Sequence, residues 1–162
     1  MIHIITGNTG AGKTSYSLHL KRETKSMLFS IDKWNNALFF PDKKDSDGVE
    51  WILERIARAE NMMMSQMVQL EELGIDSILD LGFSKFEHRE KFRIFAKKND
   101  FEFKLHFLDI DKETRMKRVL KRNTEKGDTF EFEVTQENFD FMESWFESPS
   151  DEELGNDSII VN

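Results

Sequence analysis

The sequence predicts an α/β domain in which a parallel sheet is covered by helices on both faces. Five apolar runs of strand length alternate along the chain with segments that have helical periodicity. The first of these runs, 2–6, leads directly into a glycine-rich loop, and the stretch 15–23 that follows contains neither Pro nor Gly. Strands that alternate with helices in this way form a parallel sheet through crossover connections.

Length, charge and composition limit the functions that this chain can have. With 162 residues, 38% of them hydrophobic, we expect a single domain spanning 1–162. The formal charge of −8 disfavours a long nucleic acid or an anionic membrane as partner. Cysteine is absent, which excludes disulfides, thiol nucleophiles and Cys-ligated zinc and suits a reducing cytoplasm. No run has the composition of a signal segment or a membrane span, so we expect a cytoplasmic protein.

The glycine-rich loop matches the phosphate-binding pattern G-x-x-x-x-G-K-[ST]. Its backbone amides are expected to converge on phosphate groups, and the helix that follows presents its positive N-terminus to them. Lys13 would reach the β- and γ-phosphates, and the Thr14 hydroxyl would help to hold Mg²⁺. The sequence thus predicts a nucleotide site formed by Gly7, Asn8, Thr9, Gly10, Ala11, Gly12, Lys13, Thr14 and Ser15.

The run 27–31 predicts a second strand, and Asp32 follows its end. In open parallel sheets ligands bind beyond the carboxyl ends of the strands, so Asp32 is expected on the functional rim. The segment 33–41 is a loop or a short helix that ends at Pro41. Because this segment follows Asp32, we expect a substrate pocket wall made by Trp34, Asn35, Asn36, Phe39 and Phe40.

A long helix is predicted next, because apolar residues recur at intervals of three and four from Ile52 to Leu73. Asp47 and Glu50 resemble a capping box at its start, and Gly74 is a plausible stop. The Met run 62–64 then serves mainly as core filler.

The run 75–81 predicts a third strand with Asp80 at its tip. Beside a phosphate loop, an acid in this position is the Walker B arrangement, which would hold Mg²⁺; the alternative is a plain turn carboxylate. Ser84 and Glu87 resemble a second capping box and predict a helix to about residue 98. Arg89 in that helix either reaches a substrate anion or is a surface charge.

The alternating segment 101–110 predicts a fourth strand, and Asp111 can cap the helix after it. Arg115, Arg118 and Arg122 share one face of this helix. They either form a solvated face paired with carboxylates or neutralise a transferring phosphoryl group. We expect the second role, because phosphoryl transfer needs an electropositive element near the loop.

The remaining segments complete the alternation of strands and helices. The segment 123–132 has the polar, flexible composition of a flap, and we expect a lid over approximately 115–132. A last helix is predicted from Thr135, an acidic loop over 150–156, and a fifth strand over 158–161.

With these residues in view, the chain resembles the P-loop kinases, and within them the AAA_33 group related to polynucleotide kinase, chloramphenicol phosphotransferase and zeta toxin. The likeness lies in the phosphate loop, Asp32, Asp80, and the arginines at 89, 115 and 122. It implies a three-layer α/β/α P-loop NTPase fold with a five-stranded parallel sheet of order 2-3-1-4-5. It also implies that Asp32 is the base toward an acceptor hydroxyl and that the arginines of the lid touch phosphates.

The leading hypothesis is ATP-dependent phosphoryl transfer, with Mg²⁺, to a hydroxyl of a small molecule. The polynucleotide kinase pattern has an Arg three residues after the acid, where this chain has Asn35, and this departure disfavours a nucleic-acid acceptor. Two alternatives stay open. One is a switch or binding module that binds or hydrolyses ATP and acts through a partner; the other is a polynucleotide 5′-hydroxyl kinase.

Overall fold

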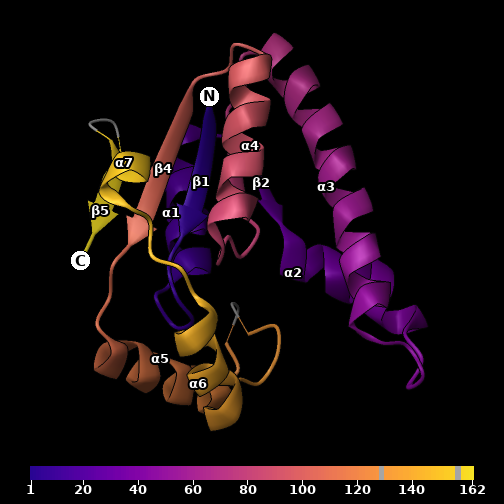
Figure 1. Ribbon diagram of the computed structural model, residues 1–162, viewed down its shortest axis with the longest axis vertical. Helices are drawn as coiled ribbons and strands as arrows, with labels where there is room; N and C mark the ends of the chain where they lie inside the picture. The colour runs from indigo at the N-terminus through magenta and orange to yellow at the C-terminus, as the bar shows by residue number, and fades with distance from the viewer. Residues whose placement is uncertain (128–129, 156–157) are drawn as a thin grey trace.

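A computed structural model describes residues 1–127, 130–155 and 158–162. Five parallel strands form one sheet in the order β2-β3-β1-β4-β5, which confirms the predicted topology (Figure 1). All strands point toward the same end of the molecule. Their bounds are β1 Ile2–Thr6, β2 Met27–Ser30, β3 Ser77–Asp80, β4 Phe103–Leu108 and β5 Ile159–Val161.

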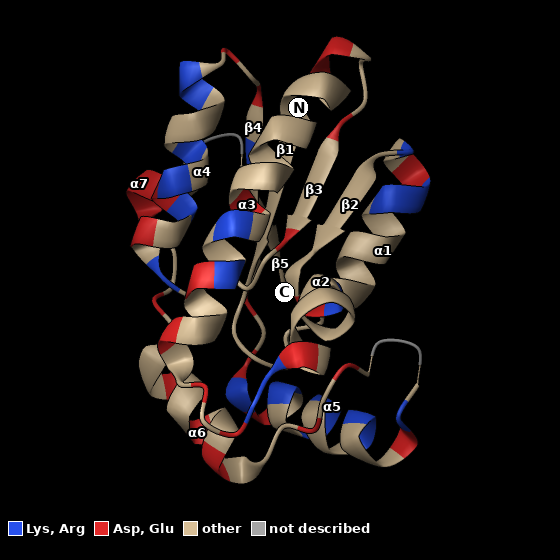
Figure 2. Ribbon diagram, turned by 90° about the vertical axis from the view of Figure 1, so that its right-hand side faces the viewer, with Lys and Arg blue, Asp and Glu red and all other residues tan. Residues whose placement is uncertain are grey.

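Helices cover both faces of the sheet, and two further helices lie beyond the carboxyl ends of the strands (Figure 2). Helix α1 lies against one face, α3 and α4 against the other, and α5 and α6 beyond the strand ends. The helices are α1 Lys13–Thr24, α2 Ile31–Trp34, α3 Val49–Glu72, α4 Phe86–Lys98, α5 Lys112–Glu125, α6 Gln136–Trp145 and α7 Asp151–Leu154. Within the described ranges, no helix is long and apolar enough to cross a membrane.

Alternation along β1 divides the core between the two faces of the sheet. Ile2 and Ile4 are buried in the larger cluster, with Met63 of α3 and Phe92 of α4. Ile5 belongs to a second cluster, against α1. The full burial of β1 explains why its sequence is a continuous apolar run, as in strands covered on both faces.

Two helix starts differ from the sequence predictions, because neither predicted capping box forms. The N-cap of α3 is Gly48, and the Asp47 carboxylate instead accepts a hydrogen bond from the Lys44 amide at 2.8 Å. The first amide of α4, that of Phe86, donates to the distant Glu147 at 3.0 Å instead of to a local cap. The predicted cap at Asp111 is confirmed, since its carboxylate accepts from the Thr114 amide at 2.9 Å.

Other predicted boundaries shift or are replaced. The segment after β2 is helical throughout: α2 continues into a π-helical turn, η1 Asn35–Phe39, and a 3₁₀ turn, η2 Phe40–Asp42. Asp32 therefore lies in the first turn of α2. The acidic segment predicted as a loop contains the short helix α7. Parts of the predicted flap and of this acidic segment, residues 128–129 and 156–157, lie outside the described residues.

A line of buried polar side chains fastens α1 to the sheet. His3 Nδ1 lies 2.9 Å from His106 Nε2, and the Tyr16 hydroxyl of α1 lies 2.8 Å from His106 Nδ1. Burial, together with the nearby His3, lowers the pKa of His106 to about 4. His106 is therefore neutral at pH 7 and can donate through one ring nitrogen while it accepts through the other.

This shift predicts a pH dependence of stability. The pKa of His106 is about 4 in the folded chain against 6.5 unfolded, so the unfolded chain binds more protons between these values. The free energy of unfolding should therefore fall as the pH drops from 6.5 to 4. In urea titrations, His106→Gln should make this slope shallower, whereas His19→Gln, on the exposed face of α1, should leave it unchanged. Equal slopes in all three proteins would contradict this assignment.

Candidate active site

The phosphate loop is held in a path that only glycine allows at two positions. Gly7 has a φ of +151° and Gly10 a φ of +82°. A Cβ on Gly7 would lie 2.8 Å from the Leu108 carbonyl oxygen, and one on Gly10 would lie 2.5 Å from the Arg115 carbonyl oxygen. The loop is thus packed directly against β4 and α5, and the glycines are needed for this contact as well as for their positive φ.

Lys13 begins α1, and its side chain turns back over the loop. Its Nζ donates to the Gly7 carbonyl oxygen at 2.8 Å and to the Asn8 carbonyl oxygen at 3.3 Å. Burial lowers the pKa of Lys13, while Asp80 and Asp32 oppose this shift. The ammonium group is therefore held at the loop by weak carbonyl contacts that a phosphate oxygen can replace with a stronger charged one.

Thr14 and Asp80 lie side by side, as a magnesium site at the strand tip requires. The Thr14 hydroxyl donates to Asp80 Oδ2 at 2.9 Å. Burial raises the pKa of Asp80, against the opposing effects of Lys13 and the Thr14 hydrogen bond. A hydroxyl and a carboxylate beside a phosphate loop are hard oxygen ligands of the kind that Mg²⁺ takes together with phosphate oxygens. The donor set thus fits the ion.

Asp32 lies on the rim beyond β2, as predicted, and faces the same charged centre. The side chain is exposed and lines the cavity described next. Partial burial and the neighbouring Asp80 raise the pKa of Asp32, and Lys13 opposes this effect. The charge of Arg122 also acts on Asp32. A carboxylate with a raised pKa accepts a proton more readily, which suits a general base.

One cavity of about 1010 Å³ includes the phosphate loop, Asp32 and Asp80. Its walls come from both sides of the loop, since β2 and β3 lie on one side of β1 and β4 and β5 on the other. The β2/β3 side contributes Asp32, Gly82 and Ser84. The β4/β5 side contributes Leu108, Ile110 and Val161. Such a volume is at the upper end for a single ligand site, so the cavity has room for two ligands.

The three predicted lid arginines have different surroundings. Arg118 and Arg122 line the cavity, and Arg118 Nη1 donates to the Ala11 carbonyl oxygen of the loop at 3.0 Å. The Nε of Arg122 is buried and has no hydrogen-bond partner within the part of the chain that the structure describes. Both arginines therefore bring positive charge to the wall of the cavity that includes the phosphate loop.

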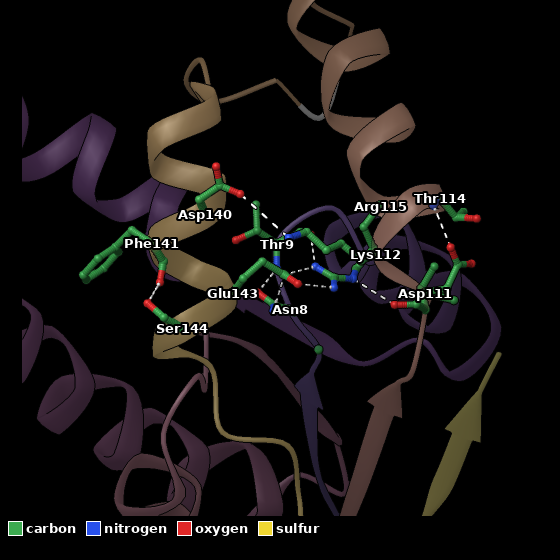
Figure 3. Close-up of polar contacts among 12 residues, drawn as sticks. Asn8, Thr9, Asp111, Lys112, Thr114, Arg115, Asp140, Phe141, Glu143 and Ser144 are labelled. Atoms are coloured by element: carbon green, nitrogen blue, oxygen red, sulfur yellow. Dashed lines mark hydrogen bonds and ion pairs between the residues drawn. The ribbon is translucent and has the colours of Figure 1, made fainter.

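Arg115 differs, and the expectation that it touches phosphate is corrected. Its guanidinium pairs with both carboxylate oxygens of Glu143 on α6, at 2.5 and 3.0 Å (Figure 3). It also donates to the Ile110 and Thr9 carbonyl oxygens, at 2.8 and 3.2 Å. Glu143 in turn accepts from the Asn8 side chain at 2.7 Å. Arg115 and Glu143 thus join α5, α6 and the tip of the phosphate loop.

Arg89, for which a substrate anion or a surface position was predicted, and Asn35, expected in the substrate pocket wall, are also corrected, because neither lines the cavity. The buried Arg89 side chain pairs with Glu153 at 2.7 and 3.0 Å and donates to the Phe83 carbonyl oxygen at 3.1 Å. Asn35 is 5% exposed and lies among packed side chains. The pocket wall predicted over 34–40 is wrong, because none of these residues is among those that line the cavity. Trp34 and Phe39 pack against the main core instead.

The cavity has an apolar wall that the sequence did not predict. It comes from the segment between α5 and α6 and from α6 itself, and includes Phe132, Val134, Phe141 and Met142. The sequence indicated a helix here, but periodicity alone does not say which face meets a ligand. Glu143 was missed as well, because its partners are distant in sequence.

Comparison with known proteins identifies the class and then the family. The most similar solved structures include Kti12 from Chaetomium thermophilum in complex with ADP-AlF3, at 13% identity and a TM-score of 0.73, with 99% of this chain and 88% of that chain covered. Another is a gluconokinase from Sinorhizobium meliloti, at 13% identity and a TM-score of 0.63, with 98% of this chain and 79% of that chain covered. A third is the APS kinase CysC from Mycobacterium tuberculosis in complex with AMPPNP and APS, at 17% identity and a TM-score of 0.63, with 98% of this chain and 87% of that chain covered.

These likenesses define a P-loop NTPase fold. The profile of the AAA_33 family, described as an AAA domain, matches residues 2–149, and the chain belongs to this family. Among curated proteins, none matches the sequence. The membership confirms the resemblance drawn from the phosphate loop and the strand-end acids.

The junction at Glu143 leads to a stability prediction with an internal control. Glu143→Gln leaves the buried Arg115 without its charged partner, so the free energy of unfolding should fall by about 1–3 kcal/mol. Asp140→Asn, on the same helix, weakens only exposed contacts, the 3.8 Å pair with Lys112 and the 3.0 Å hydrogen bond from Gln136. It should change the free energy of unfolding by less than about 0.5 kcal/mol. Urea unfolding measures the free energy of unfolding of both variants and of the wild-type protein. Equal effects would show that Glu143 contributes no more than a surface charge.

Proposed function

We propose that this protein is a kinase that transfers the γ-phosphoryl group of ATP to a hydroxyl of a small molecule. The observation that most supports this proposal is the shared cavity. It includes a phosphate loop, a hydroxyl and carboxylate pair suited to Mg²⁺, and a second carboxylate, Asp32, on the β2/β3 side. The cavity volume leaves room for an acceptor beside ATP, which hydrolysis alone does not need.

The donor is bound by the loop. Gly10 and Gly12 bring backbone amides close to the phosphates, and Lys13 exchanges its carbonyl contacts for phosphate oxygens. Thr14 and Asp80 would hold Mg²⁺, which would supply charge neutralisation for the phosphates. The described residues of the segment 115–132 act as a lid, which continues through α6, and Arg118 and Arg122 bring cationic charge to the same place.

The transfer itself requires a positioned acceptor. The hydroxyl oxygen forms a bond to the γ-phosphorus while the bond from phosphorus to the bridging oxygen of ADP breaks. The hydroxyl proton passes to Asp32, whose raised pKa favours accepting it. Arg115 does not contact the reacting groups; it holds the loop tip and α6 in place through Glu143.

A labelling experiment tests this function. The purified protein is incubated with γ-labelled ATP and Mg²⁺, in one reaction with a fraction of small metabolites and in another with a 5′-hydroxyl oligonucleotide, and the labelled products are separated. The proposal expects label on a metabolite. Label only in free phosphate would favour the NTPase or switch, and label on a 5′-hydroxyl oligonucleotide would favour the polynucleotide kinase.

Two variants separate the roles of donor and acceptor residues. Lys13→Ala should weaken ATP binding and abolish turnover, while Lys21→Ala, on the exposed face of α1, should not. Asp32→Asn should retain ATP affinity and lower transfer by about 10²- to 10⁴-fold, since it removes only the base. The exposed Asp42→Asn is its control. Transfer by Asp32→Asn at the wild-type rate would eliminate the role of Asp32 as base.

A further inference from the structure

The side of the cavity that includes Asp32, where the acceptor is expected, is bounded by the part of the lid that runs from residue 131 through α6. Two contacts place this lid against β2 and β3. Asn36, just after α2, donates to Glu131 of the lid segment at 2.7 Å, and the Glu147 amide, just after α6, donates to the Ser84 carbonyl oxygen at 2.9 Å. The segment from 131 to α6 therefore lies over the side of the cavity that Asp32 lines, here called the acceptor chamber. In the ribbon it lies between α5 and α2 (Figure 1).

The lid side of this acceptor chamber is mainly apolar. Phe132 and Phe141 line the cavity although they are 52% and 57% exposed, and Val134 and Met142 lie beside them in the wall. Two half-exposed aromatic rings on a cavity wall leave apolar surface that a ligand can cover. Asn138 and Ser84 are the neutral polar groups that complete the wall.

The charges around the chamber are unfavourable to an anion. Among the described residues of the cavity wall the Lys and Arg residues are Lys13, Arg118 and Arg122. Lys13 at the start of α1 and Arg118 on α5 bond carbonyl oxygens of the phosphate loop, and Arg122 lies near Asp32. A carboxylate or phosphate on the acceptor would compete with ATP for these cations.

Such a group would also be repelled by the carboxylates around the chamber. Asp32 and Asp80 line the cavity, and the charge of Glu131 acts on Asp32 from the lid side. Bringing like charges together in a partly desolvated site costs free energy. Repulsion by these carboxylates therefore selects against an anionic acceptor.

We propose that the acceptor is an alcohol without carboxylate or phosphate groups, neutral or cationic, whose apolar or aromatic part packs against Phe132, Phe141 and Met142. This inference rests on the proposed kinase function and adds the chemical class of the acceptor. The hydroxyl points to Asp32, the apolar part lies under the lid, and Asn138 or Ser84 bonds a neutral polar substituent.

Three probes that share a benzyl group and a hydroxyl, and differ in charge, test this inference. They are 3-phenylpropane-1,2-diol, phenylalaninol and 3-phenyllactate, which are neutral, cationic and anionic. Their affinities are measured by calorimetry or ligand-observed NMR on the full chain saturated with AMPPNP and Mg²⁺. The affinities of the diol and of phenylalaninol should be higher than that of phenyllactate by a factor of about ten or more. Phenyllactate binding as tightly as the other two would overturn the inference.

Variants identify the cause of any preference. Asp32→Asn should narrow the difference between phenyllactate and the diol, since it removes one repelling charge. Phe141→Ser should weaken all three probes by about tenfold, since it removes apolar contact area. Phe86→Ser, at a 43% exposed ring on α4, is the control and should not change their binding.

Binding of AMPPNP tests the kinase function, and binding of the probes tests the acceptor class. If AMPPNP does not bind, the proposed kinase function itself is wrong. If AMPPNP binds but neither the diol nor phenylalaninol does, the kinase function survives and the acceptor class is wrong.

Discussion

The close packing of the phosphate loop against β4 and α5 is the constraint on which the rest of the site depends. The loop passes so near the Leu108 and Arg115 carbonyl oxygens that a side chain at Gly7 or Gly10 would collide with them. This contact holds the N-terminal part of α5 against the loop, and the pairing of Arg115 with Glu143 then holds α6 beside it. The lid that bounds the acceptor chamber is therefore positioned by the same loop that is expected to bind the donor.

Around this loop, Lys13, Asp80 and Asp32 each have an opposite charge close by. Burial opposes the charged form of Lys13, Asp80 and Asp32, yet each lies within the influence of an opposite charge. The proposed donor brings negative phosphates and Mg²⁺ into this centre, where Lys13, Arg122 and the two carboxylates can each take a partner of opposite charge. The site is thus suited to a triphosphate with a bound cation more than to either alone.

Much of the fold was predictable from the sequence, because it is determined by local patterns. The strand before Gly7, the Asp111 cap and the strand-end acids Asp32 and Asp80 follow from short motifs and apolar runs. The sheet order came from the family resemblance, and the structure confirms it. The sequence did not predict which charged side chains pair over long distances. Arg115 and Arg89 were expected at phosphates or substrate, but Glu143 and Glu153 occupy them.

The same limit applies to the acceptor wall. Residues after Asp32 were expected to form it, but they fold into helical turns and two of their aromatic rings pack into the core. The wall comes instead from the segment near α6, about a hundred residues later in the chain. Only the sheet topology and the contacts of the lid bring the two segments together.

The most direct test of the account is a crystal structure with a non-hydrolysable ATP analogue and Mg²⁺. The account predicts that the γ-phosphorus lies beside Lys13 on the β2/β3 side, within about 6 Å of the Asp32 carboxylate, which leaves room for one acceptor hydroxyl between them. The adenine should lie on the β4/β5 side. Adenine in the chamber beside Phe141, or a γ-phosphate directed away from Asp32, would contradict phosphoryl transfer at this site.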